Sequence, residues 1–204
     1  NYILQRGGKP AFKGYHGFPA SLCTALNEVI VHGIPRKDEF LKEGDLFTAD
    51  CGVIYNGLYT DAARSIGIGE ISSEKRRLIS TAEKALSEAV DLIKPGIHVG
   101  EISRTIEKII RAAGFHVIHD LTGHGVGRTL HEEPVVLNYW DGKSGPVLKP
   151  GMTLAIEPIF AAGTSKMKTL NDNWTLVTVD NSTAIQMEHT ILVTENGREI
   201  LTKI

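Results

Sequence analysis

Two stretches in the middle of the chain show the three- and four-residue spacing of apolar side chains that predicts amphipathic helices. The first covers residues 72–93 and opens on a pair of serines suited to capping. Its apolar side consists of Leu78, Ala82, Ala85, Leu86, Ala89 and Leu92. The second covers about 99–113, faces Ile102, Ile106, Ile109 and Ile110 inward, and ends at Gly114. We therefore expect two helices, separated by the Lys94-Pro95-Gly96 stop.

Alternating apolar and polar positions predict strands over 45–55, 152–160 and 174–194, and most of the remaining chain is expected to be strand and loop. Asn56-Gly57 predicts a two-residue hairpin turn, because both residues tolerate positive φ. With this loop, residue 55 pairs with 58 and residue 50 with 63. Asp50 and Asp61 then become diagonal neighbours, with Cβ atoms roughly 7 Å apart. Two ionised carboxylates this close repel each other unless a positive charge lies between them.

The chain contains an internal sequence repeat. Residues 32–50 and 131–157 both read His-x-x-Pro, then Leu-Lys-x-Gly, and both end on a carboxylate nine residues after that leucine. Four elements in the same order favour duplication over coincidence. We therefore predict a single domain, residues 1–204, with pseudo-repeat halves of about 1–70 and 71–204. The helix pair before the second copy has no counterpart before the first, so we expect about 40 helical residues to be missing ahead of Asn1.

The composition of the chain restricts the classes of function that it could have. A chain of 204 residues with 42% hydrophobic and 23% charged residues is ordinary for one globular domain. The formal charge of -2 gives no reason to expect DNA or an anionic membrane as partner. No apolar run approaches the roughly 18 residues of a membrane span. Two cysteines, Cys23 and Cys51, suit a reducing cytoplasm and argue against a disulfide scaffold.

Four carboxylates end or interrupt apolar strands, and a glycine-rich segment carrying two histidines lies between them. The carboxylates are Asp50, Asp61, Glu157 and Glu188, and the segment is "TGHGVGRTLHEEP", with His124 and His131. Carboxylates in such places are rarely left unpaired, because burying a bare charge is costly. Lysines and arginines concentrate elsewhere, on helices and loops, so a pair of divalent cations would satisfy four carboxylates and one imidazole.

Oxygen-dominated ligation favours Mn, Fe or Co, with Zn or Ni as the less favoured candidates. Two such cations can share a water, lower its pKa and polarise a carbonyl, which is hydrolase chemistry. The alternative at this point is a set of unrelated structural acids.

Five segments carry a resemblance to a known family. "GYHGFPASLCTALNEVIVHGIP", "DCGVIYNGLYTD", "GHGVGRTLHEEP", "GMTLAIEP" and "QMEHTILVTENG" together resemble the type I methionine aminopeptidases of the bacterial kind, in the right order over essentially the whole chain. The resemblance implies the α/β (α+β) "pita-bread" fold, with two pseudo-symmetric halves, a curved antiparallel sheet and helices on its outer face. It also implies a cytoplasmic and monomeric enzyme acting on nascent polypeptide N-termini, near the ribosome exit.

The resemblance also assigns roles to residues. Asp61 and Glu188 would bridge two metal ions, Asp50 would hold one ion, and His124 and Glu157 the other. His32 and His131 would position the scissile amide and stabilise the oxyanion, and Glu157 would move the proton of the attacking water. The methionine pocket would be lined by Tyr15, His16, Phe18, Cys23, Leu130 and Trp174, next to His32 and His131.

Three residues depart from the usual pattern of this family, namely Phe12, Leu130 and Met187, of which Leu130 would loosen one pocket wall.

Two alternative functions remain. A proline-specific aminopeptidase or prolidase shares the five ligands, although the "YHGFP" segment and the short chain argue against it. A non-catalytic binding module on the same fold is the other, although all five ligand positions and both histidines are intact.

Overall fold

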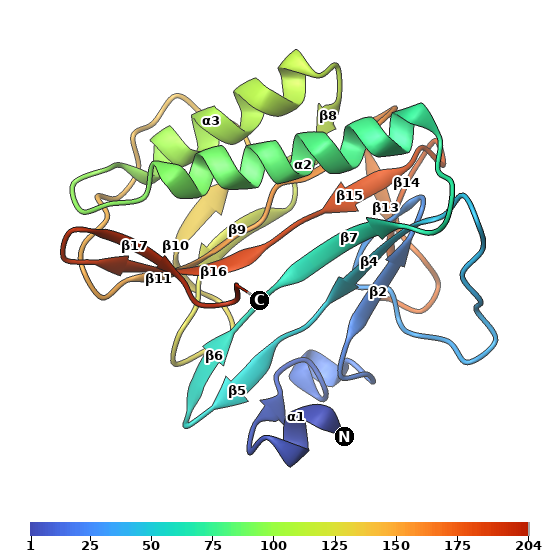
Figure 1. Ribbon diagram of the computed structural model, residues 1–204, viewed down its shortest axis with the longest axis horizontal. Helices are drawn as coiled ribbons and strands as arrows, with labels where there is room; N and C mark the ends of the chain where they lie inside the picture. The colour runs from blue at the N-terminus through green and yellow to red at the C-terminus, as the bar shows by residue number, and fades with distance from the viewer. Residues whose placement is uncertain (204) are drawn as a thin grey trace.

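The computed structural model describes residues 1–203, in which two long helices lie on one side of a strongly twisted antiparallel sheet system (Figure 1). The helical elements are α1 (Tyr2–Gln5), η1 (Tyr15–Gly17), α2 (Ser73–Asp91) and α3 (Val99–Ala112). The strands of the first part are β1 (Lys9–Pro10), β2 (Cys23–Leu26), β3 (Val29–Val31), β4 (Leu46–Asp50), β5 (Val53–Tyr55), β6 (Leu58–Thr60) and β7 (Ala63–Gly67). The later strands are β8 (His116–Val117), β9 (Thr122–Gly125), β10 (Glu132–Leu137), β11 (Thr153–Ile156), β12 (Ile159–Ala161), β13 (Met167–Thr169), β14 (Leu176–Thr178), β15 (Ala184–Gln186), β16 (His189–Thr194) and β17 (Gly197–Ile200).

Both predicted helices are confirmed to within two residues. The Ser72 hydroxyl caps α2 by accepting a hydrogen bond from the Lys75 N–H at 3.2 Å. In α3 the Glu101 carboxylate accepts from the His98 N–H at 3.1 Å, and Gly114 follows the helix at a φ of +80°. The predicted apolar side of α2 is wrong at its end, because Leu92 is only half-buried and Val90 and Ile93 are buried instead.

The hairpin is confirmed in its predicted register. Tyr55 pairs with Leu58 across the Asn56-Gly57 turn, and Asp50 pairs with Ala63. Asn56 and Gly57 both have positive φ, at 49° and 79°. One register therefore runs from the turn through to the strand pair β4–β7, and it brings Asp61 back toward Asp50.

Two sets of three antiparallel strands share one plan. In the first, β4 lies between β2 and β7, and in the second, β11 lies between β9 and β16. The core between the helices and the sheets is built from side chains such as Leu78, Ile102 and Ile106, packed with Leu154 and Ile191. Neither of the long helices, nor any shorter one in the described residues, combines the length and apolarity that crossing a membrane requires.

Candidate metal centre

Each of the four predicted carboxylates lies at or next to a strand end, and all four are buried. Asp50 is the last residue of β4, and Asp61 lies between β6 and β7. Glu157 directly follows β11, and Glu188 directly precedes β16. The two strand sets therefore contribute two carboxylates each, from corresponding places.

The fifth predicted ligand, His124, lies on β9 next to β11, opposite Ala155. Its Nδ1 lies 2.8 Å from the carbonyl oxygen of Gly125, and since a carbonyl can only accept, Nδ1 carries the proton. Burial lowers the pKa of His124 to about 4, so the ring is neutral. Its unprotonated Nε2 has a lone pair that can coordinate a metal ion. That Nε2 atom lies 3.4 Å from Oε1 of Glu157.

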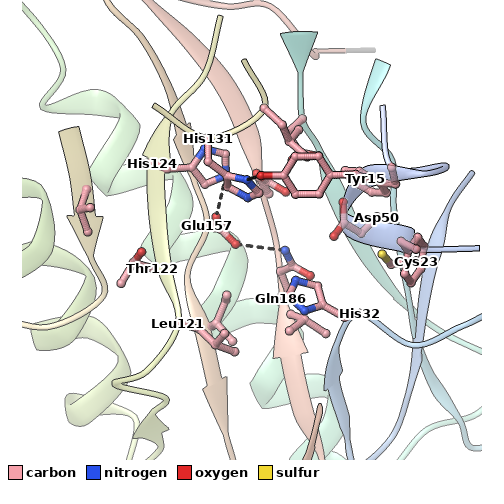
Figure 2. Close-up of a pocket in the computed structure, with 18 of the residues that line it drawn as sticks. Tyr15, Cys23, His32, Asp50, Leu121, Thr122, His124, His131, Glu157 and Gln186 are labelled. Atoms are coloured by element: carbon pink, nitrogen blue, oxygen red, sulfur yellow. Dashed lines mark hydrogen bonds and ion pairs between the residues drawn. The ribbon is translucent and has the colours of Figure 1, made fainter. Parts of the chain in front are cut away.

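The five side chains converge. Potential ligand atoms of Asp61, His124 and Glu188 all lie within 4.8 Å of one another. Glu157 joins this group through His124, as the dashed line in Figure 2 shows, and Asp50 faces the same space from the opposite wall. The structure thus brings together all five residues that were predicted from the sequence.

The electrostatics of this cluster are unfavourable for bare carboxylates. Burial, followed by the charges of Asp61 and other neighbouring carboxylates, holds the pKa values of Asp50, Glu157 and Glu188 well above their usual range. Burial also raises the pKa of Asp61 to about 7. Without a compensating cation, the cluster would have to keep protons that isolated carboxylates lose.

The donor set fits divalent metal ions. Oδ1 of Asp50 and Oε1 of Glu188 are buried and have no hydrogen-bond partner among residues 1–203. No lysine or arginine of those residues lines the surrounding cavity, which has a volume of about 590 Å³. Carboxylate oxygens with one neutral imidazole are ligands for hard or intermediate divalent cations. The residues that are present can therefore hold such ions.

His32 and His131 border the same cavity. His131 lies toward the end of the Gly-rich segment, and its Nδ1 lies 2.8 Å from the Tyr15 hydroxyl (Figure 2). The rings of His131 and His124 are 4.3 Å apart between centroids. His32 follows β3 with a φ of 59° and lines the cavity. Desolvation within the cavity and the nearby His131 lower the pKa of His32.

An apolar compartment adjoins the carboxylates. Phe18, Cys23 and Leu130 are buried there with Phe12 and Ala11, and Tyr15 and Trp174 pack against them. Phe18 and Trp174 meet edge to face, 5.1 Å between centroids. His16 has a φ of 45°, and its ring lies edge-on against that of Tyr15, which lines the cavity; its role in the pocket stays a prediction. Met187 is buried in the helix-covered core, away from this compartment.

Gln186 is a site residue that the sequence reasoning missed. It is 3% exposed, ends β15, and donates a hydrogen bond from Nε2 to Oε2 of Glu157 at 3.2 Å (Figure 2). The only sequence signal was a polar residue inside an otherwise apolar strand, two positions before Glu188.

Residues 1–195 match the profile of metallopeptidase family M24. A methionine aminopeptidase of Clostridium acetobutylicum is 44% identical over 202 residues, which is 99% of this chain and 81% of that protein. The methionine aminopeptidase of Escherichia coli K12 is 44% identical over 203 residues, covering 99% and 77%. The chain belongs to the methionine aminopeptidases of family M24.

Solved structures place the fold in the same family. The crystal structure of a methionine aminopeptidase from Thermotoga maritima superposes with a TM-score of 0.96 at 46% identity, covering 99% of this chain and 81% of the other. This confirms the pita-bread architecture. A prolidase from Pyrococcus furiosus shares the fold at a TM-score of 0.69 and 29% identity, covering 89% of this chain and 49% of the prolidase. The family likeness thus favours the methionine aminopeptidases over the prolidases.

Proposed function

We propose that residues 1–204 form one catalytic domain that removes the initiator methionine from nascent polypeptides whose second residue is small, using two divalent cations. The chain is a metallopeptidase of the methionine aminopeptidase family, so release of an N-terminal methionine is its activity. The observation that carries the finer proposal is the convergence of four buried carboxylates and one neutral imidazole in a cavity without lysine or arginine among residues 1–203.

The five side chains would divide between two ions. Asp61 and Glu188 would be shared by both cations, Asp50 would complete one site, and His124 with Glu157 the other. Mn, Fe or Co suits this set best, with Zn or Ni less favoured. When bound, such a pair lowers the pKa of a water between the ions and polarises the carbonyl of the scissile bond.

The protein's own residues handle the protons. Glu157 is placed to accept the proton of the attacking water and pass it to the leaving amine, because the hydrogen bond from Gln186 Nε2 fixes its carboxylate. If the Tyr15 hydroxyl donates to Nδ1 of His131, the proton of that imidazole lies on Nε2. His131 and His32 can then donate hydrogen bonds to the amide and to the oxyanion that develops from it.

The apolar compartment is the site for the methionine side chain. Phe18, Trp174 and Tyr15 offer ring edges and faces, with which a thioether sulfur makes favourable contacts. Leu130 forms a further wall of the compartment. The free α-amino group of the substrate would lie beside the acidic ligands, which limits cleavage to the first residue.

The substrates are the N-termini of newly made chains, so we further propose that the enzyme works as a cytoplasmic monomer near the ribosome exit. The two free cysteines agree with a reducing compartment.

Metal titration of peptide hydrolysis tests the proposal. Chelator-treated protein should be inactive on Met-Ala-Ser, and Mn²⁺ or Co²⁺ should restore hydrolysis as the two sites fill. An Xaa-Pro dipeptide serves as the matched control and should stay intact under the same conditions. Hydrolysis of the Xaa-Pro peptide but not of Met-Ala-Ser would favour the prolidase alternative. Failure of either metal to restore activity to folded protein would favour a non-catalytic module.

A further inference from the structure

The two strand sets meet at the place where Asp61 and Glu188 lie, and they do not form one continuous sheet there. β7 and β16 belong to separate sheets, although Figure 1 shows the start of one beside the start of the other. Within residues 1–203, one main-chain hydrogen bond crosses the junction, from the Glu188 N–H to the carbonyl of Ala63 at 2.9 Å. The relative position of the two shared carboxylates therefore depends on few contacts.

The Ser65 hydroxyl of β7 donates to the Gln186 carbonyl of β15 at 2.6 Å, and a threonine hydroxyl supplies two further contacts that reach Asp61 itself. Oγ1 of Thr190, two residues after Glu188 on β16, accepts a hydrogen bond from the Asp61 N–H at 2.8 Å. The same hydroxyl donates to the Asp61 carbonyl at 2.7 Å. Thr190 is completely buried, and Asp61 is 5% exposed. Within residues 1–203, neither main-chain group of Asp61 has a main-chain partner.

The Thr190 hydroxyl pairs with both main-chain groups of Asp61, as the main chain of a neighbouring strand would do in a sheet. A hydroxyl is both donor and acceptor, so it satisfies the N–H and the carbonyl of one residue at once. Removing it would leave two main-chain groups unpaired in a buried place, and the Asp61 segment would have to shift to find other partners. The carboxylate of Asp61 would move with its main chain.

We propose that Thr190 is a positioning residue of the metal centre, which holds Asp61 at the correct separation from Glu188 through paired hydrogen bonds across the junction. It touches neither a metal ligand atom nor the methionine compartment. The inference rests on the proposed two-ion site, because only shared ligands from both strand sets make their separation matter. Partners that orient metal ligands typically change metal affinity or activity by about 10–100-fold when they are removed.

Isothermal titration calorimetry of chelator-treated protein with Co²⁺ tests this proposal, because it measures the Co²⁺ dissociation constant without relying on enzymatic activity. Thr190→Val keeps the shape of the side chain and removes the hydroxyl, whereas Thr190→Ser keeps the hydroxyl. Thr178→Val is the matched control, because Thr178 is also fully buried and its hydroxyl donates to the Ser182 carbonyl, outside the cavity lining.

We expect Thr190→Val to raise the Co²⁺ dissociation constant by roughly 10–100-fold, with Thr190→Ser close to the unsubstituted protein and Thr178→Val unchanged. At saturating metal, kcat should be reduced in Thr190→Val while KM for Met-Ala-Ser stays the same. Equal Co²⁺ affinity in Thr190→Val and the unsubstituted protein would overturn the proposal. So would an equal loss of affinity in Thr178→Val, since that loss would reflect general destabilisation.

Two further outcomes are informative. If Thr190→Val does not fold, Thr190→Cys replaces it, because a thiol keeps the size but is a weak donor and acceptor, and its Co²⁺ affinity should fall below that of Thr190→Ser. If both variants fail to fold while Thr178→Val folds, Thr190 is a determinant of folding and the proposal is wrong. If the unsubstituted protein binds no Co²⁺, the proposed function itself fails, which is a separate result.

Discussion

Replacing Asp61 with asparagine should make the metal-free protein more stable at pH 8, although it should abolish catalysis. Asp61 is buried beside three other carboxylates, and burial raises its pKa from 3.8 to about 7. Asparagine has no proton to lose and keeps an Oδ1 atom, which can still accept the hydrogen bond from the Ala62 N–H at 3.1 Å. The substitution thus removes the charge with little change of shape.

The size of the effect follows from linkage. Between pH 4 and pH 7 the folded protein keeps a proton on Asp61 that the unfolded chain releases, so stability falls as the pH rises through this window. A shift from 3.8 to about 7, at about 1.36 kcal/mol per unit, corresponds to a cost of about 4 kcal/mol above pH 7. At pH 5.5 about half of that cost is present. Asp61→Asn avoids the whole of it.

Urea denaturation of chelator-treated protein measures this effect. The stability gain of Asp61→Asn should be largest at pH 8 and about half as large at pH 5.5. Added Mn²⁺ should reverse the order at pH 8, because the unsubstituted site binds the ions and the variant loses a shared ligand. A variant that is less stable than the unsubstituted protein in the absence of metal, or a gain that does not depend on pH, would refute the reasoning.

Three further substitutions test separate parts of the site. His131→Ala should lower kcat on Met-Ala-Ser by roughly 10²-fold, as for loss of an oxyanion donor, and unchanged steady-state kinetics would remove His131 from the mechanism. Phe18→Ala should lower kcat/KM for methionine peptides by roughly 10–100-fold, because about 1.5–3 kcal/mol of apolar contact with the substrate is lost. The Co²⁺ affinity measured by calorimetry should not change, and an equal loss of metal affinity would contradict a pocket role for Phe18. Gln186→Leu should lower kcat by roughly tenfold and leave KM unchanged, because the hydrogen bond to Glu157 disappears, and a change confined to KM would argue against that role.

Local signals were sufficient for the elements that position the site. The Asn56-Gly57 turn fixed the register between Asp50 and Ala63, because a two-residue loop leaves one way to pair the flanking strands. The repeated pattern that ends on Asp50 and Glu157 marked corresponding strand ends. These features depend on neighbours in the chain, which a sequence displays directly.

Contacts between distant strands were not predictable in this way. Gln186 and Thr190 lie in strands where a polar side chain gives no periodic signal, and their partners are 29 and 129 residues away. His16 belongs to a segment that the resemblance assigned to the pocket, and its ring packs against Tyr15 beside the cavity. Leu92 is the C-cap of α2, and the neighbouring Ile93 fills the buried position that was assigned to it.

The central claim is that Asp50, Asp61, His124, Glu157 and Glu188 together hold two divalent cations. Anomalous diffraction from a crystal grown with Mn²⁺ tests it most directly. The account predicts two anomalous peaks in the cavity, with Asp61 and Glu188 contacting both, Asp50 contacting one, and His124 and Glu157 the other. A single peak at saturating Mn²⁺, or two peaks with any of the five side chains outside coordination distance, would contradict it.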